Sequence, residues 1–284
     1  MGAGAVNYAA ACNTAVTKLM AAQVPEAKEN ALLLLEHICG SRRQDMYLDP
    51  GRILTRDEKD KYFDLIDKRC ARIPLQLLTG TAYFFGLAFK VDGNVLIPRQ
   101  DTEILVGRVL DDGACGCALL DMCTGSGCIP ISIMKHAKLS FAAGCDRSPE
   151  ALKNAAENAA LLKAAVEFYE GDMFEALPEE MKGSFDIITS NPPYIKSGDI
   201  AGLMPEVRDH DPYMALDGGT DGLIFYRRIA DEALSWLKEG GRIYMEIGCD
   251  QAGDVSRIFA EKGYKDIEVI KDYAGLDRVI FCRA

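Results

Sequence analysis

Apolar residues recur at three- and four-residue spacing through the first quarter of the chain, which is the period of amphipathic helices. The segment VPEAKENALLLLEHIC follows this period and runs into Gly40, a residue type that commonly ends helices. The segment TRDEKDKYFDLIDKRCARI opens with Thr55, a suitable N-cap, and carries acidic residues in its first turn. We therefore expect residues 1–78 to form a small bundle of helices.

The pattern changes after residue 78, where aromatic and β-branched residues replace helix formers. Turn signals at Gly86 and in the Asp92-Gly93-Asn94 triplet interrupt this stretch. We expect a β-hairpin between about Thr81 and Ile97, within a linker of residues 79–98 that joins two domains.

From residue 99 to the C-terminus, short apolar runs alternate with helical patterns. The runs of strand length are ALLDMC, FAAGCD, AVEFYEG, FDIITSN and GRIYMEIG. Such alternation is typical of an α/β fold with a mostly parallel sheet, which we expect for residues 99–284. The last two apolar runs, IEVIKD and LDRVIFCR, have only a short loop between them and predict a terminal antiparallel hairpin.

Composition narrows the classes of function and the compartment. The formal net charge is −11, and this acidity weighs against broad binding to phosphate backbones. The ten cysteines include no CxxC pair, so no metal site is expected. No apolar run approaches the ~20 residues of a membrane span, and no signal peptide is evident. We expect a cytoplasmic protein without a membrane partner.

A glycine-rich loop, CTGSGC, follows the first strand of the α/β region, which is expected to end at Asp121. Gly125 and Gly127 let the backbone turn sharply and approach a ligand closely. Pro130 stands where a dinucleotide site has its third glycine, and a Walker lysine is absent, so neither NAD nor a nucleoside triphosphate is favoured. On its own, the loop is equally compatible with a plain strand-to-helix turn.

Acidic residues follow the next two strands. Asp146 ends the second strand, where a carboxylate can accept hydrogen bonds from both ribose hydroxyls of an adenosine ligand. Ser148 and Pro149 then provide the N-cap and first position of a helix. After the third strand, Asp172 can accept from an adenine amino group, and Met173 can either cover the ring or pack in the core.

The fourth strand ends at the tetrapeptide Asn191-Pro192-Pro193-Tyr194. Two prolines fix two φ angles and remove two N–H donors, so this loop is stiff and extended. The Asn191 side-chain carbonyl and the Pro192 backbone carbonyl can accept from both N–H groups of a planar amide, while Tyr194 stacks on its face. A planar nitrogen is a poor nucleophile and must be held in line with its electrophile, so this loop favours alkylation of such a nitrogen.

With these motifs the chain resembles the PrmC/HemK family of release factor glutamine methyltransferases. An NPPY tetrapeptide after the fourth strand marks methyltransferases that modify planar nitrogens with S-adenosylmethionine. The resemblance runs from about residue 74 to the C-terminus, and the helical N-terminal region agrees in size and character. Besides NPPYI, the matching segments are PLQLLTGTAYFFGLAF, VLIPRQDTEILV, LLDMCTGSGCIPISI, VRDHDPYMALDGGTDGLIFYRRI, EIGCDQA and GLDRVIFCR.

The resemblance implies a Rossmann-like, S-adenosylmethionine-dependent methyltransferase fold with a seven-stranded, mostly parallel sheet, a small all-α domain before it and a β-hairpin linker between them. It implies N5-methylation of the glutamine in the Gly-Gly-Gln motif of class 1 peptide chain release factors, with S-adenosylhomocysteine as product. It also implies that the N-terminal bundle docks the release factor. We expect a monomer that needs no metal and binds no nucleic acid directly.

The resemblance also assigns residues. Phe84 would help to close the site over the glutamine, and residues 191–194 would bind it, with Asn191, Pro192 and Tyr194 as the catalytic set. The implied cofactor-binding residues are Cys123, Thr124, Gly125, Ser126, Gly127, Asp146, Asp172, Met173 and Asn191. Two positions depart from the family pattern, because Cys123 replaces the first glycine of the loop and Gln100 replaces a frequent proline. The expected consequence is an altered affinity for the cofactor.

Two other functions fit part of the pattern. A methyltransferase of adenine N6-type exocyclic amines in nucleic acid would use the same amide clamp on a flipped-out base, but the acidic balance and the lack of a basic insertion weigh against it. A binding module without activity would not need the intact residues 191–194.

Overall fold

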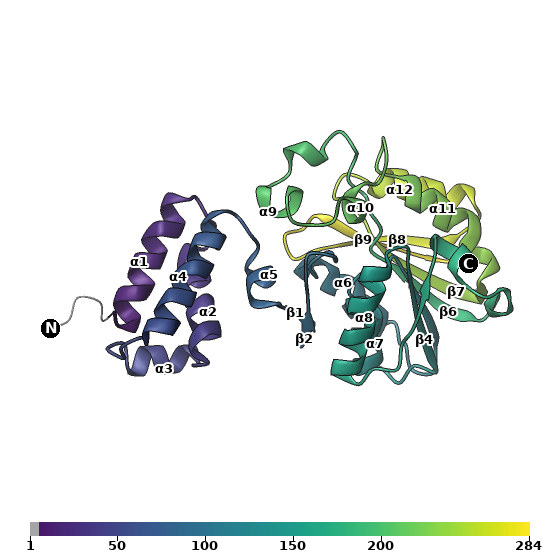
Figure 1. Cartoon of the computed structure of the whole chain (residues 1–284). Helices are drawn as coiled ribbons and strands as arrows, with labels where there is room; N and C mark the ends of the chain where they lie inside the picture. Colours follow the sequence, from purple (N-terminus) through teal and green to yellow (C-terminus); the bar gives the residue numbers. More distant parts are fainter. Residues whose placement is uncertain (1–5) are drawn as a thin grey trace. The chain divides into compact units, whose positions relative to one another are not determined.

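The computed structural model describes residues 6–284. The chain divides into two compact units, with the boundary between Gly80 and Thr81 (Figure 1).

The first unit is helical and has its own core. Tyr62 is fully buried there and donates a hydrogen bond to the Ala31 carbonyl at 2.9 Å, which joins two of the helices. Ala15, Leu34 and Ile66 are fully buried around it. The helices are α1 (Tyr8–Ala21), α2 (Ala27–Cys39), α3 (Arg43–Leu48), α4 (Arg56–Cys70) and α5 (Leu75–Thr79).

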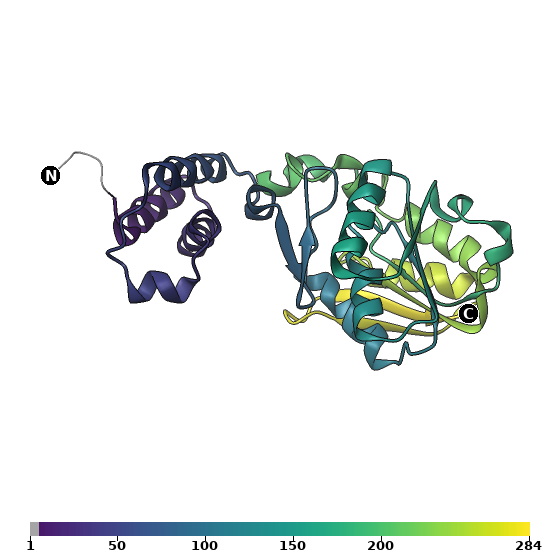
Figure 2. The same cartoon turned by 60° about the horizontal axis from the view of Figure 1, so that its bottom comes forward.

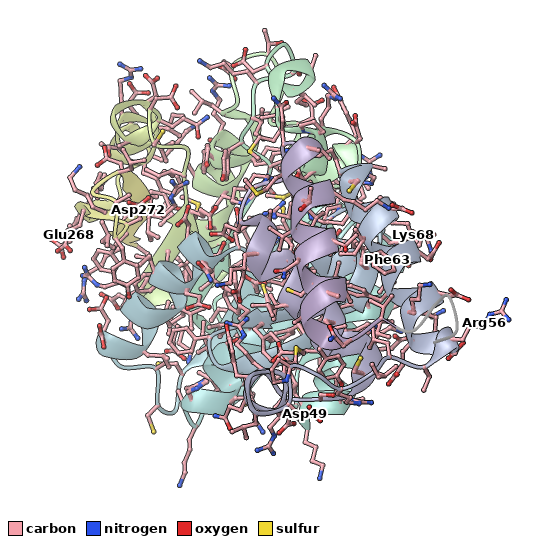
Figure 3. All side chains as sticks on the ribbon, turned by 90° about the vertical axis from the view of Figure 1, so that its left-hand side faces the viewer. Asp49, Arg56, Phe63, Lys68, Glu268 and Asp272 are labelled. Atoms are coloured by element: carbon pink, nitrogen blue, oxygen red, sulfur yellow. The ribbon has the colours of Figure 1, made fainter. Side chains whose placement is uncertain are left out.

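Local signals set the ends of these helices as the sequence predicts. Gly40 ends α2 with a φ of +60°, in the left-handed region that favours glycine. Thr55 caps α4: its side chain accepts from the Glu58 N–H, and the Glu58 carboxylate accepts from the Thr55 N–H. Figure 3 shows Arg56, the first residue of α4, extending into solvent.

The hairpin packs as part of the second unit. It pairs β1 (Thr81–Phe84) with β2 (Leu87–Lys90) through a two-residue turn in which Phe85 and Gly86 both have positive φ. Phe84 and Phe89 are fully buried in the same core as residues of the α/β unit. The expectation that the hairpin extends to Ile97 is wrong, because β2 ends at Lys90 and the buried residues beyond it form no ladder.

A seven-stranded sheet forms the centre of the second unit within the described residues, in the order β5-β4-β3-β6-β7-β9-β8. β3 to β7 all run parallel to one another, whereas β9 is antiparallel to both β7 and β8. This confirms the predicted α/β fold and its terminal hairpin. The strands are β3 (Ala118–Met122), β4 (Phe141–Asp146), β5 (Glu167–Glu170), β6 (Phe185–Ser190), β7 (Leu237–Glu246), β8 (Lys265–Lys271) and β9 (Asp277–Arg283).

Helices cover both faces of this sheet (Figures 1 and 2). The hairpin and α6 to α8 share one core, and α11 and α12 share the other. β3 lies between them, so Leu119 packs on one side and Leu120 on the other. Burial on both faces explains why the strands read as continuous apolar runs. The helices are α6 (Glu103–Asp111), α7 (Cys128–His136), α8 (Pro149–Leu162), α11 (Ile224–Glu232) and α12 (Ala252–Glu261).

The chain reverses its direction across the sheet at β3, because β4 and β5 lie on one side of it and β6 and β7 on the other. Open α/β sheets bind ligands at the carboxyl ends of their strands beside such a switch point. Further short helices are η1 (Gln100–Thr102), η2 (Met173–Ala176), η4 (Ile200–Gly202), α9 (Pro205–Arg208) and α10 (Tyr213–Leu216).

Within residues 6–284, no helix is both long and apolar enough to cross a membrane. No cluster of three or more metal-ligating side chains is found in that range either. The ten cysteines all fall inside it, and each is a free thiol.

Candidate active site

A cavity of about 270 Å³ opens at the carboxyl ends of β3, β4 and β6. This is close to the lower end of the volumes typical of small-molecule sites, about 300 Å³. Seven of the predicted site residues line it: Cys123, Gly125, Asp146, Asp172, Met173, Asn191 and Pro193. Pro192 and Tyr194, from the same loop as Asn191, do not line it. The structure therefore brings the ends of four separate segments of sequence to one cavity.

The glycine loop joins β3 to α7. Gly125 faces the cavity, and a Cβ added there would meet no atom within 4 Å, so its backbone is open to a ligand. Gly127, the N-cap residue of α7, has a φ of +76°, and a Cβ there would come within 2.9 Å of the Ile131 side chain. The side chains of Thr124 and Ser126 are buried. These two residues and Gly127 do not line the cavity, so they contribute to the conformation of the loop and not to the cavity wall.

Asp146 fixes the position of this loop. Its Oδ2 accepts from the Gly125 N–H at 2.8 Å, and its Oδ1 accepts from the Ser148 N–H at 3.0 Å. Burial raises the pKa of Asp146, and the N–H groups that it accepts hold the pKa down. One carboxylate therefore ties the glycine loop to the start of α8 and still lines the cavity.

Asp172 and Met173 lie at the same edge. Asp172 Oδ1 accepts from Arg228 Nη1 at 2.8 Å, and Arg228, on α11, also lines the cavity. The sequence gives no indication of Arg228, because it is 56 residues away. Met173 is 4% exposed, so it packs in the core and lines the cavity at the same time.

Asn191 and Tyr194 project from the loop after β6. Asn191 lines the cavity, and its Nδ2 donates to Thr102 Oγ1 at 3.2 Å. The Tyr194 hydroxyl donates to Glu246 Oε1 at 3.1 Å, and burial is the main cause that raises the pKa of Tyr194. Thr102 and Glu246 are further residues that the sequence does not reveal.

A glycine-rich segment clamps the backbone of this loop. A Cβ on Gly218 would lie 2.8 Å from the Pro193 carbonyl oxygen, and one on Gly222 would lie 2.4 Å from the Tyr194 carbonyl oxygen. Gln251 Nε2 donates to that same Tyr194 carbonyl at 2.9 Å. Only glycine allows this approach, which gives a physical reason for the ALDGGTDG stretch.

Phe84 does not lie where the resemblance suggests. Its side chain is fully buried in the core and makes a T-shaped contact with Phe89, with 6.1 Å between the ring centroids. It does not line the cavity. Strand alternation turns Tyr83 outward instead, and that residue is 78% exposed. The expected closing role of Phe84 is therefore not supported.

Cys123 occupies a position that favours glycine, because its φ is +57°. Its sulfur lies 3.8 Å from the Met173 sulfur. Burial, and then nearby Asp146, raise the pKa of the Cys123 thiol well above its ordinary value, so the group is protonated and weakly nucleophilic.

Cys123→Gly is expected to raise the free energy of unfolding by about 0.5–1 kcal/mol. A left-handed conformation costs a non-glycine residue about 1–2 kcal/mol, and the greater freedom of glycine in the unfolded chain offsets about half of that. Denaturant unfolding measures the change. Cys145→Gly is the matched control: this cysteine is buried in β4 without a positive φ, so its loss should destabilise the protein. A loss of stability in both variants would contradict the strain at Cys123.

Asp121, in β3, is a fully buried carboxylate beneath the glycine loop. Thr189 Oγ1 donates to its Oδ1 at 2.7 Å, whereas Oδ2 has no hydrogen-bond partner among the described residues. Burial raises the pKa of Asp121 to about 7, although the hydroxyls of Thr124 and Thr189 hold it down.

This pKa predicts a pH-dependent stability. The native state binds the Asp121 proton more tightly than the unfolded chain does, so this contribution is present at low pH and is lost as the pH rises through about 7. Asp121→Asn removes the titration. The stability of the variant relative to the parent should therefore rise by roughly 2 kcal/mol between about pH 5 and pH 7, at up to about 1.4 kcal/mol per pH unit. Denaturant unfolding of both proteins at each pH tests this, and parallel pH profiles would refute it.

Two domain families match the chain. The PrmC N-terminal domain matches residues 10–80, and a methyltransferase domain matches residues 115–272. A crystal structure of a methyltransferase from Pyrococcus furiosus has a TM-score of 0.53 at 17% identity and covers 70% of this chain and 89% of that one, which shows that the fold is shared.

Full-length relatives are closer in sequence. A release factor glutamine methyltransferase of Thermodesulfovibrio yellowstonii is 40% identical over 263 residues, which cover 90% of this chain and 91% of that protein. One of Agrobacterium fabrum is 38% identical over 290 residues and covers 99% of both chains. These matches confirm the resemblance, and the chain belongs to the family of release factor glutamine methyltransferases.

Proposed function

We propose that this chain methylates N5 of the glutamine in the Gly-Gly-Gln motif of class 1 peptide chain release factors, with S-adenosylmethionine as methyl donor. One observation carries the proposal: Asn191, from the NPPY loop, lines the same cavity as Gly125 and Asp146. A site for an amide nucleophile and a site for an adenosyl ligand thus share one space. Full-length relatives that bear the name release factor glutamine methyltransferase support the choice of substrate.

The cavity suits the cofactor in chemistry as well as in position. Gly125 leaves open space where a side chain would stand, and the carboxylates of Asp146 and Asp172 offer acceptors for hydroxyl and amino groups. We assign Asp146 to the ribose end and Asp172, through the oxygen that Arg228 leaves free, to the adenine end. Met173 covers the ring. When bound, S-adenosylmethionine supplies an electrophilic methyl group.

The residues of the NPPY loop orient the glutamine amide. Asn191 Oδ1 and the Pro192 carbonyl accept from its two N–H groups, and Tyr194 stacks against its face. The close approach of Gly218 and Gly222 keeps this backbone rigid, so the acceptors are in place before the substrate arrives.

The proposal also assigns a role to the N-terminal unit, an oligomeric state and a cellular compartment. We assign the N-terminal unit, which matches the PrmC N-terminal domain, to docking of the release factor. We also propose that the protein acts as a monomer in the cytoplasm and binds no nucleic acid directly. The ten free thiols suit a reducing compartment, and the net charge of −11 opposes binding to phosphate backbones.

Mass spectrometry of an unmethylated release factor, after incubation with this protein and S-adenosylmethionine, tests the proposal. The expected result is one methyl group on the Gly-Gly-Gln glutamine. Duplex DNA and bulk RNA are incubated in parallel. Methyl transfer to nucleic acid alone would replace the proposed substrate with an exocyclic amine of a base.

A further inference from the structure

Glu246 is a buried carboxylate that holds two site residues at once. It ends β7 and is 2% exposed. Thr102 Oγ1 donates to its Oε2 at 2.5 Å, and the Tyr194 hydroxyl donates to its Oε1 at 3.1 Å. Each carboxylate oxygen therefore has one hydroxyl donor, and the two donors come from segments 92 positions apart in the sequence.

The polarity of this network reaches Asn191. An ionised carboxylate only accepts hydrogen bonds, so Thr102 must give its single hydroxyl hydrogen to Glu246. The Thr102 oxygen is then an acceptor toward its other neighbour, and Asn191 must present Nδ2 to it, as the 3.2 Å contact shows. The Oδ1 atom, at the other end of the same amide group, can then accept a hydrogen bond from another partner.

Two hydroxyl donors and one cation oppose the effect of burial on Glu246. Burial is the largest influence and leaves the pKa of Glu246 raised, while Thr102, Tyr194 and the guanidinium of Arg278 on β9 limit the rise. Asp101 acts in the opposite direction. Arg278 is tied to Asp272 at 3.1 Å and is 12% exposed, so its position is fixed.

We propose that Glu246 is a positioning residue for methyl transfer, which acts through Thr102 to turn the Asn191 carbonyl toward the substrate and through the Tyr194 hydroxyl to hold the stacking ring. The inference rests on the proposed function for its substrate. It goes beyond that function because neither Glu246 nor Thr102 belongs to the NPPY loop or to the cofactor-binding set.

Thr102→Val tests the hydrogen bond between Asn191 and Thr102. Valine keeps the shape of threonine and removes the hydroxyl, so Asn191 loses the acceptor that sets its orientation. We expect kcat for methylation of the release factor to fall by about 10- to 100-fold. The Kd for S-adenosylhomocysteine, measured by calorimetry, should stay within about threefold, because Thr102 does not line the cavity. Thr102→Ser keeps the hydroxyl and should restore kcat to within about threefold of the parent.

Two further variants separate positioning from stability. Tyr244→Phe removes another buried tyrosine hydroxyl that donates to a carboxylate, Asp112, at 2.9 Å, but it lies outside the cavity and should leave kcat within about twofold. Tyr194→Phe keeps the stacking ring and leaves Glu246 Oε1 without its donor, so kcat should fall by about 3- to 10-fold. This variant decides the proposal if Thr102→Val does not fold.

The outcomes are distinct. Turnover of Thr102→Val or Tyr194→Phe equal to that of the parent, or a Thr102→Ser as impaired as Thr102→Val, overturns the proposal. Absence of methylation by the parent protein overturns the proposed function instead.

In that event the orientation of Asn191 is tested without substrate. The Asn191 side-chain amide is observed by NMR after ¹⁵N-asparagine labelling and is identified by its loss in Asn191→Ala. Thr102→Val should shift this signal and accelerate its hydrogen exchange, and an unchanged signal overturns the positioning role.

Discussion

Asn191→Ala is expected to lower kcat by about 100- to 1,000-fold, the loss typical of removing one preorganised polar group from an active site. Asn191 Oδ1 is the acceptor that we assign to the side-chain amide of the substrate glutamine. Without that acceptor, the substrate nitrogen samples many orientations. Cofactor affinity should stay within about threefold, because the Asn191 side chain makes no hydrogen bond to Asp146 or Asp172, the two carboxylates that we assign to the cofactor. Single-turnover methylation and calorimetry with S-adenosylhomocysteine separate the two effects.

Asn94→Ala is the control for this experiment. Asn94 also lines the cavity, but it is exposed and only its backbone N–H makes a hydrogen bond, to Asp92 at 2.9 Å. Its removal should change kcat by less than about threefold. Near-parental turnover of Asn191→Ala would remove Asn191 from the catalytic set and leave the Pro192 carbonyl to orient the amide alone.

The sequence predicts the fold well where the signals are local. Ser148 caps α8, with Pro149 at the first helical position, and Gly40 ends α2. β4 ends at Asp146 as expected, and β3 ends one residue past Asp121. Each of these signals depends on neighbours within about four residues along the chain.

Burial on the hairpin is harder to foresee. Phe84 and Tyr83 are adjacent aromatic residues in a strand of four, and only packing against the α/β unit decides which one is buried. The buried residues Val91, Val95 and Ile97 resemble a strand in sequence, but they pack without a ladder. The spacing of apolar residues indicates which side chains are buried, but it does not indicate whether the segment forms hydrogen bonds with a neighbouring strand.

The partners of the site residues could not be predicted. Arg228 binds Asp172 across 56 positions, Thr102 binds Asn191 across 89, and Thr102 binds Glu246 across 144. These residues match no spacing rule, because the sheet brings together strands that are far apart in sequence. The motifs identify the residues that face the cavity, and the fold supplies those that hold them in place.

Asp146 is expected to dominate cofactor affinity. Its two oxygens accept from backbone N–H groups of Gly125 and Ser148, and hydrogen bonds to a charged group contribute about 1.5–3 kcal/mol each. Without this carboxylate, the glycine loop loses its tie to α8, and the ribose hydroxyls lose their acceptor. Both effects weaken binding of the cofactor and leave the NPPY loop intact. The substitution should therefore change the Kd of the cofactor more than it changes kcat.

Asp146→Ala should therefore weaken binding of S-adenosylhomocysteine by about 100-fold, while kcat at saturating S-adenosylmethionine falls by less than about tenfold. Calorimetry and saturation kinetics measure the two quantities. The control is Asp186→Asn, because Asp186 also accepts a backbone N–H, that of Ala118 at 2.7 Å, but lies at the amino end of β6, outside the cavity. That variant should lose stability and keep its cofactor affinity. Equal affinity in Asp146→Ala and the parent would show that the glycine loop holds its shape without the carboxylate, and the ribose contact would have to be assigned to another residue.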